Sequence, residues 1–168
     1  MKSKDYICDK LDLSILSQLQ DDGRKSYTDI AKELNVSINT VRNRVMVLMK
    51  QDTLSIFGRI NPHHVGFHAP ATIHIKVNLR YIEDVISQLS QYPEVSWLAT
   101  VLGDSDIVMD VMCKDVENLT EVLTKRIPSI KGVIGVKTYF ILKINKIAQP
   151  DLHQIMNNLD DDKSSESP

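Results

Sequence analysis

One predicted helix carries a row of polar side chains that could read the edges of DNA bases. The side opposite its apolar stripe holds Asn39, Thr40, Asn43 and Val47, with Arg44 flanking them. Amide and hydroxyl groups near a helix N-terminus can hydrogen-bond base edges, and a methyl-bearing side chain can contact thymine. The cations of the same helix can neutralise phosphates: Arg42, Arg44 and Lys50. We therefore predict that this face meets a groove of DNA.

The elements before this helix favour a helix-turn-helix over a plain surface helix. Any solvated helix has polar residues opposite an apolar stripe, so composition alone leaves both interpretations open. A first helix is predicted from the spacing of Leu11, Ile15, Leu16 and Leu19. It ends at Asp22-Gly23, and Ser26 then caps a short second helix. Asn35-Val36-Ser37 forms the turn, and Ser37 caps the third helix, from Ile38 to about Lys50.

The C-terminal half alternates between strand and helix periodicity. Residues 61–68 read as a linker that contains proline and histidine, and alternation from Ala71 to Leu79 predicts a half-buried strand. A helix follows with Ile82, Val85, Ile86 and Leu89 on one face, and VSWLATVL and IVMDVMC read as two further strands. Asp115 caps a second helix, and VIGVKTYFILKI is the last strand. This order predicts an α+β fold, a ferredoxin-like βαββαβ sandwich.

We expect the sheet of this sandwich to form a homodimer. Both predicted helices cover the same face of the sheet, which leaves the other face to the solvent. Depending on register, that other face carries the apolar residues Leu98, Leu102, Val108, Met112 and Ile141. A two-fold dimer also suits a protein that reads DNA, because it places two recognition helices on two half-sites.

The distribution of charge along the chain indicates how it is divided into domains. Net charge is +2 over residues 1–60 (ten Lys and Arg, eight Asp and Glu), zero over 61–150 (nine and nine) and −4 over 151–168 (one and five). We therefore predict a DNA-binding domain over 1–60, a linker over 61–68, a second domain over 69–150 and an acidic, disordered tail over 151–168.

Cys8 and Cys113 are too few for a disulfide framework, and Cys113 lies in an apolar run. No apolar run is long enough to span a membrane, so we expect a cytoplasmic protein.

At this point the residues resemble the Lrp/AsnC, or feast/famine, family of transcription regulators over nearly the whole chain. The segment LDLSILSQLQDDGRKSYTDIAKELNVSINTVRNRVMVL is similar to the winged helix-turn-helix of that family. INPHHVG resembles its linker, VLGDSDIVMDV its Gly-Asp hairpin, and IPSIKGVIGVKTYFIL its last strand. The resemblance implies a sequence-specific DNA-binding regulator that is not an enzyme. It also implies dimers and often octamers of four dimers, which hold small effectors, commonly amino acids, at contacts between dimers.

The resemblance carries over to particular residues. On the recognition helix and its cap, it implies DNA contacts from Ser37, Asn39, Thr40, Arg42, Asn43 and Arg44. Around the hairpin, it implies effector contacts from Gly103, Asp104 and Asp106, with Leu98, Thr100 and Thr138 as neighbours. Ser105 stands where the family often has an aromatic residue, which leaves the identity of the effector open. Asp52 replaces the usual glycine after the recognition helix, and Asp visits the left-handed conformation more readily than most residues.

Three other functions remain as alternatives. Sirohaem decarboxylases resemble the same two-domain architecture and catalyse tetrapyrrole chemistry, so a coloured purified protein would favour an enzyme of that class. A ligand-sensing module without DNA binding is the second alternative, and salt-dependent DNA binding would exclude it. Gly103-Asp104-Ser105 also spells the nucleophile block of GDS-type esterases, but only a short segment follows Ser105. We predict a polar hairpin turn there.

The histidines do not predict a metal or haem site. His63, His64, His68 and His74 have no cysteine or carboxylate at ligand spacing. We therefore expect no cofactor, a solvated linker and a strand position for His74 on the polar face.

Overall fold

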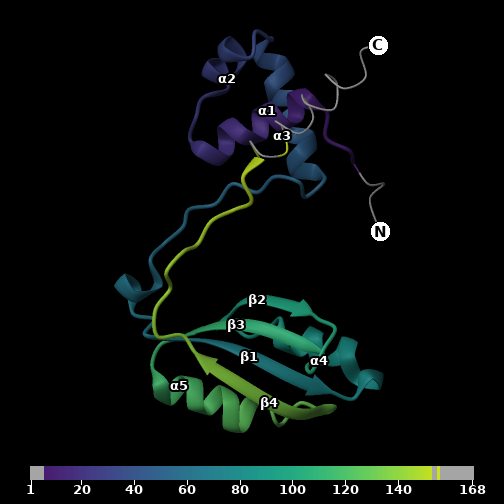
Figure 1. The fold of residues 1–168 in the computed structure, drawn as a ribbon, viewed down its shortest axis with the longest axis vertical. Coiled ribbons are helices and arrows are strands. Elements are labelled where there is room, and N and C mark those ends of the chain that lie inside the picture. Colours follow the sequence, from purple (N-terminus) through teal and green to yellow (C-terminus); the bar gives the residue numbers. More distant parts are fainter. Residues whose placement is uncertain (1–5, 153–154, 156–168) are drawn as a thin grey trace, which may run out of the picture. The chain divides into compact units, whose positions relative to one another are not determined.

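The computed structural model describes residues 6–152 and residue 155 of this chain. Two compact units are present, and each is described here by itself (Figure 1). The first contains the described residues up to Gly58 and those from Ala148 onward, and the second spans Arg59–Ile147. Within the described residues, no helix combines the length and apolar character that a membrane crossing requires.

The first unit confirms the predicted helix-turn-helix. Its helices are α1 (Lys10–Asp21), α2 (Tyr27–Glu33) and α3 (Ile38–Lys50). Ser26 and Ser37 accept backbone hydrogen bonds as the predicted N-caps of α2 and α3, and Asp9 caps α1 through a capping box. The three helices share a core formed by Ile15, Leu19, Ile30, Ala31, Val41 and Val45. Asn35 takes a left-handed conformation (φ 53°) in the turn before α3.

The chain leaves α3 through a left-handed residue. Asp52 has φ 55°, the conformation that we expected it to tolerate in place of glycine. The described residues from Gln51 to Asn61 contain no strand, so a wing built as a β-hairpin is not seen there. The linker then forms a short 3₁₀ helix, η1 (Pro62–Val65).

The second unit has the predicted ferredoxin-like order of elements. These are β1 (Ala69–Val77), η2 (Leu79–Tyr81), α4 (Ile82–Leu89), β2 (Val95–Thr100), β3 (Ile107–Cys113), α5 (Val116–Glu121), η3 (Val122–Arg126) and β4 (Val133–Phe140). The strands form one antiparallel sheet in the order β2-β3-β1-β4. Asp115 caps α5 as predicted, and η3 is a π-helical extension of that helix.

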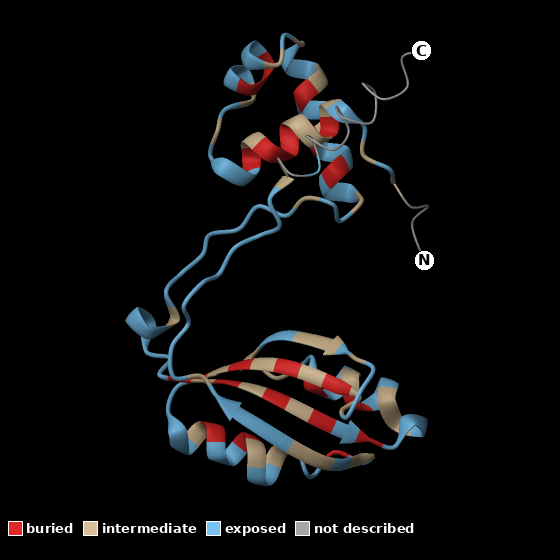
Figure 2. Cartoon of the chain, viewed as in Figure 1, coloured by how far each residue is buried: buried red, intermediate tan, exposed pale blue. Residues whose placement is uncertain are grey.

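The core of this unit lies between the helices and one face of the sheet. Ile73, Ile75 and Met109 on β1 and β3 are fully buried, and they form one cluster with apolar residues of both helices: Val85 and Leu89 from α4, and Leu119 from α5. Strands β1 and β3 therefore alternate between buried residues and half-buried ones, apart from the exposed Lys76 on β1 (Figure 2). Each fully buried aliphatic side chain contributes about 1.5–3 kcal/mol to folding. Cys113 belongs to this core as predicted, and burial raises the pKa of its thiol to about 11.

A β-bulge corrects the prediction for the open face of the sheet. The register of β2 against β3 shifts between Val95 and Trp97, so Trp97 lies opposite Asp110 and Leu98 lies opposite the buried Met109. Leu98 therefore packs against the core, and its predicted place on the open face is wrong. Because a shift of one residue turns every later side chain to the other face, Trp97 takes the place expected for Leu98. Val108 and Met112 alternate with the buried residues of β3 and do lie on the open face.

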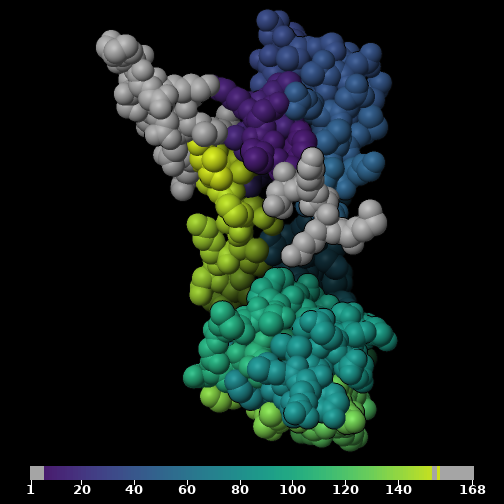
Figure 3. Space-filling view, turned by 90° about the vertical axis from the view of Figure 1, so that its right-hand side faces the viewer, coloured from purple at the N-terminus to yellow at the C-terminus, as the bar shows by residue number. Residues whose placement is uncertain are grey.

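The end of the described chain returns to α1. The Gln20 side-chain amide donates a hydrogen bond to the carbonyl oxygen of Pro150 at 2.7 Å. Figure 3 shows this yellow C-terminal segment beside the purple residues at the start of the chain. Most of the tail predicted to be disordered lies outside the described residues.

Candidate functional site

The exposed side of α3 carries most of the residues predicted to contact DNA. Val41, Val45 and Leu48 are buried and fix the orientation of the helix. Five side chains that we predicted to meet DNA are exposed on the rest of the helix: Asn39, Arg42, Asn43, Val47 and Lys50. This surface offers amides, a methyl-bearing side chain and cations, the groups that major-groove recognition uses.

Hydrogen bonds organise the first turn of α3. The Ser37 hydroxyl accepts from the backbone N–H of Thr40 at 3.0 Å and lies 2.8 Å from the Thr40 hydroxyl. Arg42 donates to the Asn39 side-chain oxygen at 3.3 Å. Asn43 has no side-chain partner among the described residues. Ser37 and Thr40 thus hold the helix end, whereas the Asn43 amide keeps its full hydrogen-bonding capacity.

Arg44 differs from the other predicted DNA contacts because its guanidinium lies against α1. Its Nη1 donates to Asp9 Oδ2 at 2.7 Å and to both carboxylate oxygens of Asp12 at 3.3 Å. The pKa of Arg44 is raised, first by the hydrogen bond to Asp9 and then by Tyr6 and the charge of Asp12. The structure places Arg44 in an ion-pair network, and its contact with DNA stays a prediction.

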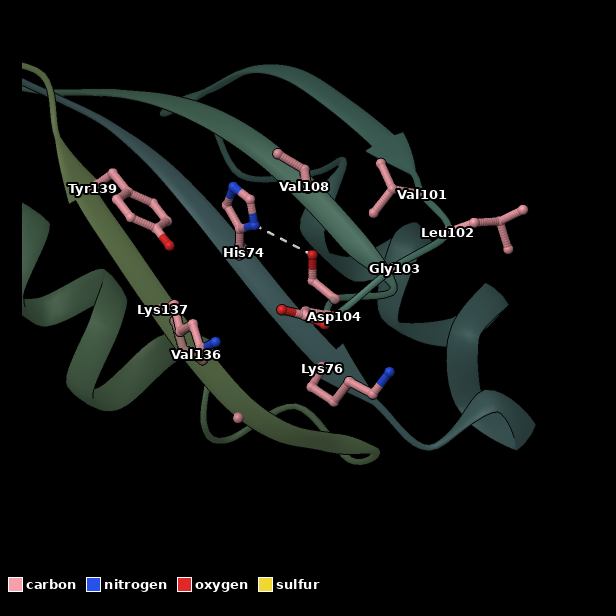
Figure 4. A pocket seen from close by; sticks show the side chains of 12 residues that line it. His74, Lys76, Val101, Leu102, Gly103, Asp104, Val108, Val136, Lys137 and Tyr139 are labelled. Carbon is pink, nitrogen blue, oxygen red and sulfur yellow. Dashed lines mark hydrogen bonds between the residues drawn. The ribbon is translucent and has the colours of Figure 1, made fainter.

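A hollow of about 590 Å³ opens beside the β2–β3 hairpin on the open face of the sheet (Figure 4). The hairpin residues Val101–Ser105 form one wall, and side chains of β1, β3 and β4 form the floor and the other wall. The strand residues that line it are His74, Lys76, Val108, Gly135, Val136, Lys137 and Tyr139. Strands β1 and β4 are adjacent in the sheet, so residues far apart in the sequence meet here.

His74 occupies the middle of the hollow and is held from two sides. Its Nδ1 lies 3.2 Å from the Ser105 hydroxyl, the contact drawn as a dashed line in Figure 4. Its ring also meets the ring of Tyr139 edge to face, with centroids 5.1 Å apart. The hairpin serine therefore fixes an imidazole whose other nitrogen has no hydrogen-bond partner among the described residues.

Asp106 supports the hairpin from the side. Its carboxylate accepts hydrogen bonds from the Val77 backbone N–H and the Lys76 ammonium, both at 2.9 Å. These two contacts lower the pKa of Asp106, the backbone hydrogen bond more than the lysine. Lys76 also lines the hollow, but its ion pair with Asp106 already neutralises the charge of its ammonium group.

Two opposite charges remain without a partner at the hollow. Asp104 belongs to the hairpin and Lys137 to β4, and neither has an ion pair or side-chain hydrogen bond among the described residues. Because β1 lies between the β2–β3 hairpin and β4 in the sheet, the two charges approach the hollow from opposite sides (Figure 4). A small molecule that carries both an ammonium and a carboxylate group would complement this arrangement.

The structure brings only part of the predicted effector set to the hollow. Gly103 and Asp104 line it, and Asp106 holds the adjacent strand end. Leu98, Thr100 and Thr138 lie opposite Met109, Ile107 and Ile73, which face the helices, and none of the three lines the hollow. We did not predict the lining residues His74, Lys76, Lys137 and Tyr139 as effector contacts. The alternation of polar residues in both strands is a signal for their shared face, but only the pairing register places them together.

The alternative sites find less support in the geometry. Within the described residues, no group of three or more His, Cys, Asp and Glu side chains gathers as metal ligands do. His63 and His68 contact each other edge to face, with ring centroids 4.5 Å apart. Ser105 does lie beside His74, but no carboxylate among the described residues hydrogen-bonds that imidazole, as the third member of an esterase triad would.

Comparisons with known proteins agree with this architecture. The AsnC-type helix-turn-helix domain matches residues 9–49, and the Lrp/AsnC ligand binding domain matches residues 70–150. The chain is similar to an HTH-type transcriptional regulator of Pyrococcus horikoshii, with 34% identity over 139 residues, 82% of this chain and 88% of that protein. It is also 32% identical to the HTH-type transcriptional regulator Ptr1 of Methanocaldococcus jannaschii, over 82% of this chain and 94% of that protein.

Solved structures share the fold of the chain. Escherichia coli AsnC superposes with a TM-score of 0.78 at 24% identity, covering 87% of this chain and 99% of that one. The transcriptional regulator NMB0573 of Neisseria meningitidis, solved as an L-Met complex, superposes with a TM-score of 0.75 at 21% identity, covering 84% of this chain and 94% of that one. Two family models match the helix-turn-helix and the C-terminal domain, relatives at 34% and 32% identity align over 82% of the chain, and the chain belongs to the Lrp/AsnC family of transcriptional regulators.

Proposed function

We propose that this regulator binds operator DNA through α3 and that a free amino acid in the hairpin hollow changes its affinity for that DNA. The observation that carries the effector proposal is the pair of unpartnered charges, Asp104 and Lys137, on opposite sides of one hollow. The effector ammonium pairs with Asp104 and its carboxylate with Lys137, while its side chain lies over Val108 and Tyr139. The solved L-Met complex of a protein with the same fold supports an amino acid as the ligand class.

DNA recognition is divided between base reading and phosphate contact. Asn39 and Asn43 are exposed amides on α3 and suit base edges, above all adenine, which an Asn can contact with two hydrogen bonds. Arg42 and Lys50 are exposed cations on the same helix and suit phosphates. Ser37 caps the N-terminal turn of α3 and Thr40 bonds to this cap, so both act through the position of that turn. The DNA target is a promoter or operator site.

The assembly that we propose is a homodimer, with higher oligomers up to four dimers. Apolar side chains on or beside the open sheet face are exposed: Trp97 at 51%, Tyr139 at 55% and Leu102 at 104% of their reference areas. A second copy would remove this surface from water and place a second α3 on a second half-site. A further dimer that docks against the hairpin would close the hollow. Effector binding in the hollow would then control the assembly of dimers.

Binding measured by fluorescence anisotropy tests the proposal. The target is the duplex upstream of the chain's own gene, against a scrambled duplex, over a salt series, with and without pooled amino acids. We expect preference for the upstream duplex, an affinity that falls steeply with salt, and a change when amino acids are added. Equal affinity for both duplexes would refute sequence-specific reading, and no response to any amino acid would refute the effector proposal.

A further inference from the structure

The start of α1 and the middle of α3 are joined by a hydrogen-bond network centred on Asp12. Its Oδ2 accepts from the Tyr6 hydroxyl at 2.7 Å and from the Asp9 backbone N–H at 3.1 Å. Arg44 Nη1 approaches both oxygens of Asp12 at 3.3 Å. Asp9 completes the network, because its Oδ1 accepts from the Asp12 backbone N–H at 2.9 Å and its Oδ2 pairs with Arg44 at 2.7 Å. One guanidinium thus joins both carboxylates of the capping box of α1.

Burial makes this network sensitive to the loss of a member. The Asp12 side chain is 1% exposed, whereas that of Arg44 is 35% exposed. A buried carboxylate that loses its cation remains as an uncompensated charge, which costs more than a broken surface ion pair. Arg44 is therefore held at a fixed place on α1, and α3 is held with it.

The other cations of α3 have no such attachment. Arg42 is exposed and bonds only to Asn39 on its own helix, and Lys50 is exposed at the last turn. Both can turn toward a phosphate without breaking a contact to another helix. For Arg44, a phosphate would compete with two carboxylates for the same Nη1 nitrogen. Among the described residues, Arg42 and Lys50 therefore have no ion pair, whereas Arg44 already has one.

We propose that Arg44 is a positioning residue that sets the angle of α3 against α1, and that Tyr6, Asp9 and Asp12 share this role. Arg44 then supports base reading by Asn39 and Asn43 without neutralising a phosphate. The proposal rests on the proposed function, since a fixed angle matters only if α3 reads DNA. It makes Tyr6 and Asp9, which precede α1, determinants of specificity that act through the position of α3.

Salt dependence separates positioning from phosphate contact. Each phosphate that a protein neutralises adds about 0.9 to the slope of log affinity against log salt. Specific affinity is measured for a duplex that the wild-type chain enriches from a random pool, and non-specific affinity for a scrambled duplex. Arg42→Ala is the matched control on the same helix, and we expect it to lower the slope by about 0.9 and to weaken both duplexes alike.

Arg44→Ala is expected to weaken the enriched duplex about tenfold, the size of a lost charged hydrogen bond, while its salt slope and its scrambled-duplex affinity stay at wild-type values. Tyr6→Phe removes one hydroxyl and leaves every cation in place. This variant tests the network if Arg44→Ala fails to fold. We expect Tyr6→Phe to lower the ratio of enriched-duplex affinity to scrambled-duplex affinity, as Arg44→Ala does, but by a smaller factor. Arg44→Lys keeps a cation at the site and should restore part of the ratio.

The outcomes separate the two proposals. A slope that falls in Arg44→Ala as far as in Arg42→Ala would show a phosphate contact and overturn the positioning role alone. A Tyr6→Phe chain that keeps the full affinity ratio would overturn the role of the network. A wild-type chain that enriches no duplex would refute DNA reading by α3, and the positioning role with it.

Discussion

The Gln20 side-chain amide on α1 holds the backbone of Pro150, with 2.7 Å between the amide nitrogen and the carbonyl oxygen. The same side chain points its oxygen toward the backbone N–H of Leu152 at 3.5 Å. The Gln20 side chain on α1 therefore binds the segment around Pro150, which follows the end of β4 at Phe140. Strand β4 carries Lys137 and Tyr139, which line the hollow, and the chain runs on from this strand into the segment that Gln20 holds.

Replacing Gln20 should release the C-terminal segment. We expect Gln20→Ala to raise the hydrogen-exchange rate of the Leu152 backbone amide several-fold, because this N–H is bonded to the Gln20 side chain and one hydrogen bond contributes about 0.5–1.5 kcal/mol. Gln88→Ala is a matched control, since the Gln88 side chain bonds only the Asp84 carbonyl of its own helix. Unchanged exchange in Gln20→Ala would mean that other contacts hold the segment.

The turn before β4 depends on Gly132. Its φ is +103°, and a Cβ at this position would lie 2.4 Å from the Cβ of Tyr81. We expect Gly132→Ala to lower the free energy of unfolding by about 2–3 kcal/mol, from backbone strain and overpacking together. Gly58→Ala is the control, because a Cβ there would meet nothing within 4 Å. Denaturant unfolding that gives equal midpoints for the two variants would contradict this account.

Asp106 should make the stability of the chain depend on acidity. The backbone N–H of Val77 and then the Lys76 ammonium lower its pKa in the folded state, below the unfolded value of about 3.9. A lowered pKa stabilises the fold above the unfolded pKa, and this stabilisation is lost as the pH falls through the folded pKa. The difference in unfolding free energy between the wild type and Asp106→Asn should therefore be largest above about pH 5 and shrink toward pH 2. A difference that is constant over this range would rule out the carboxylate charge as its cause.

Effector binding should fail when the charges at the hollow are removed singly. We expect Asp104→Ala to abolish the thermal shift that a bound amino acid produces, while affinity for DNA without the effector changes little. Lys137→Met tests the opposite wall and should do the same. Lys143→Met is the matched control, since that lysine follows β4 and does not line the hollow. A full thermal shift in either hollow variant would remove that residue from the site.

Asn43 should specify one base pair in each half-site. Its side-chain amide is exposed on α3 and has no partner among the described residues, so it is available to a base edge. We expect Asn43→Ala to relax preference at one position of a selected duplex at a cost of about 1–3 kcal/mol. Selection from a random pool with both chains gives the comparison. Identical selected sequences would exclude Asn43 from base reading.

The sequence alone determined the elements and much of their chemistry. Caps and hydrophobic periods are local features, so Ser26, Ser37 and Asp115 marked helix starts, and the IVMDVMC segment gave the bounds of β3. The exposed face of α3 followed from its helical period, because the buried Val41, Val45 and Leu48 leave only one side free.

Only the tertiary structure decided how these elements meet. A bulge between Val95 and Trp97 turned Leu98 into the core, and strand period alone does not reveal an inserted residue. The meeting of His74 with Ser105 and Lys137 depends on pairing between distant strands, and the attachment of Arg44 to Asp12 depends on how two helices pack. Periodicity tells which side of an element is buried, but the partner of each side chain is set by register and packing across the whole unit.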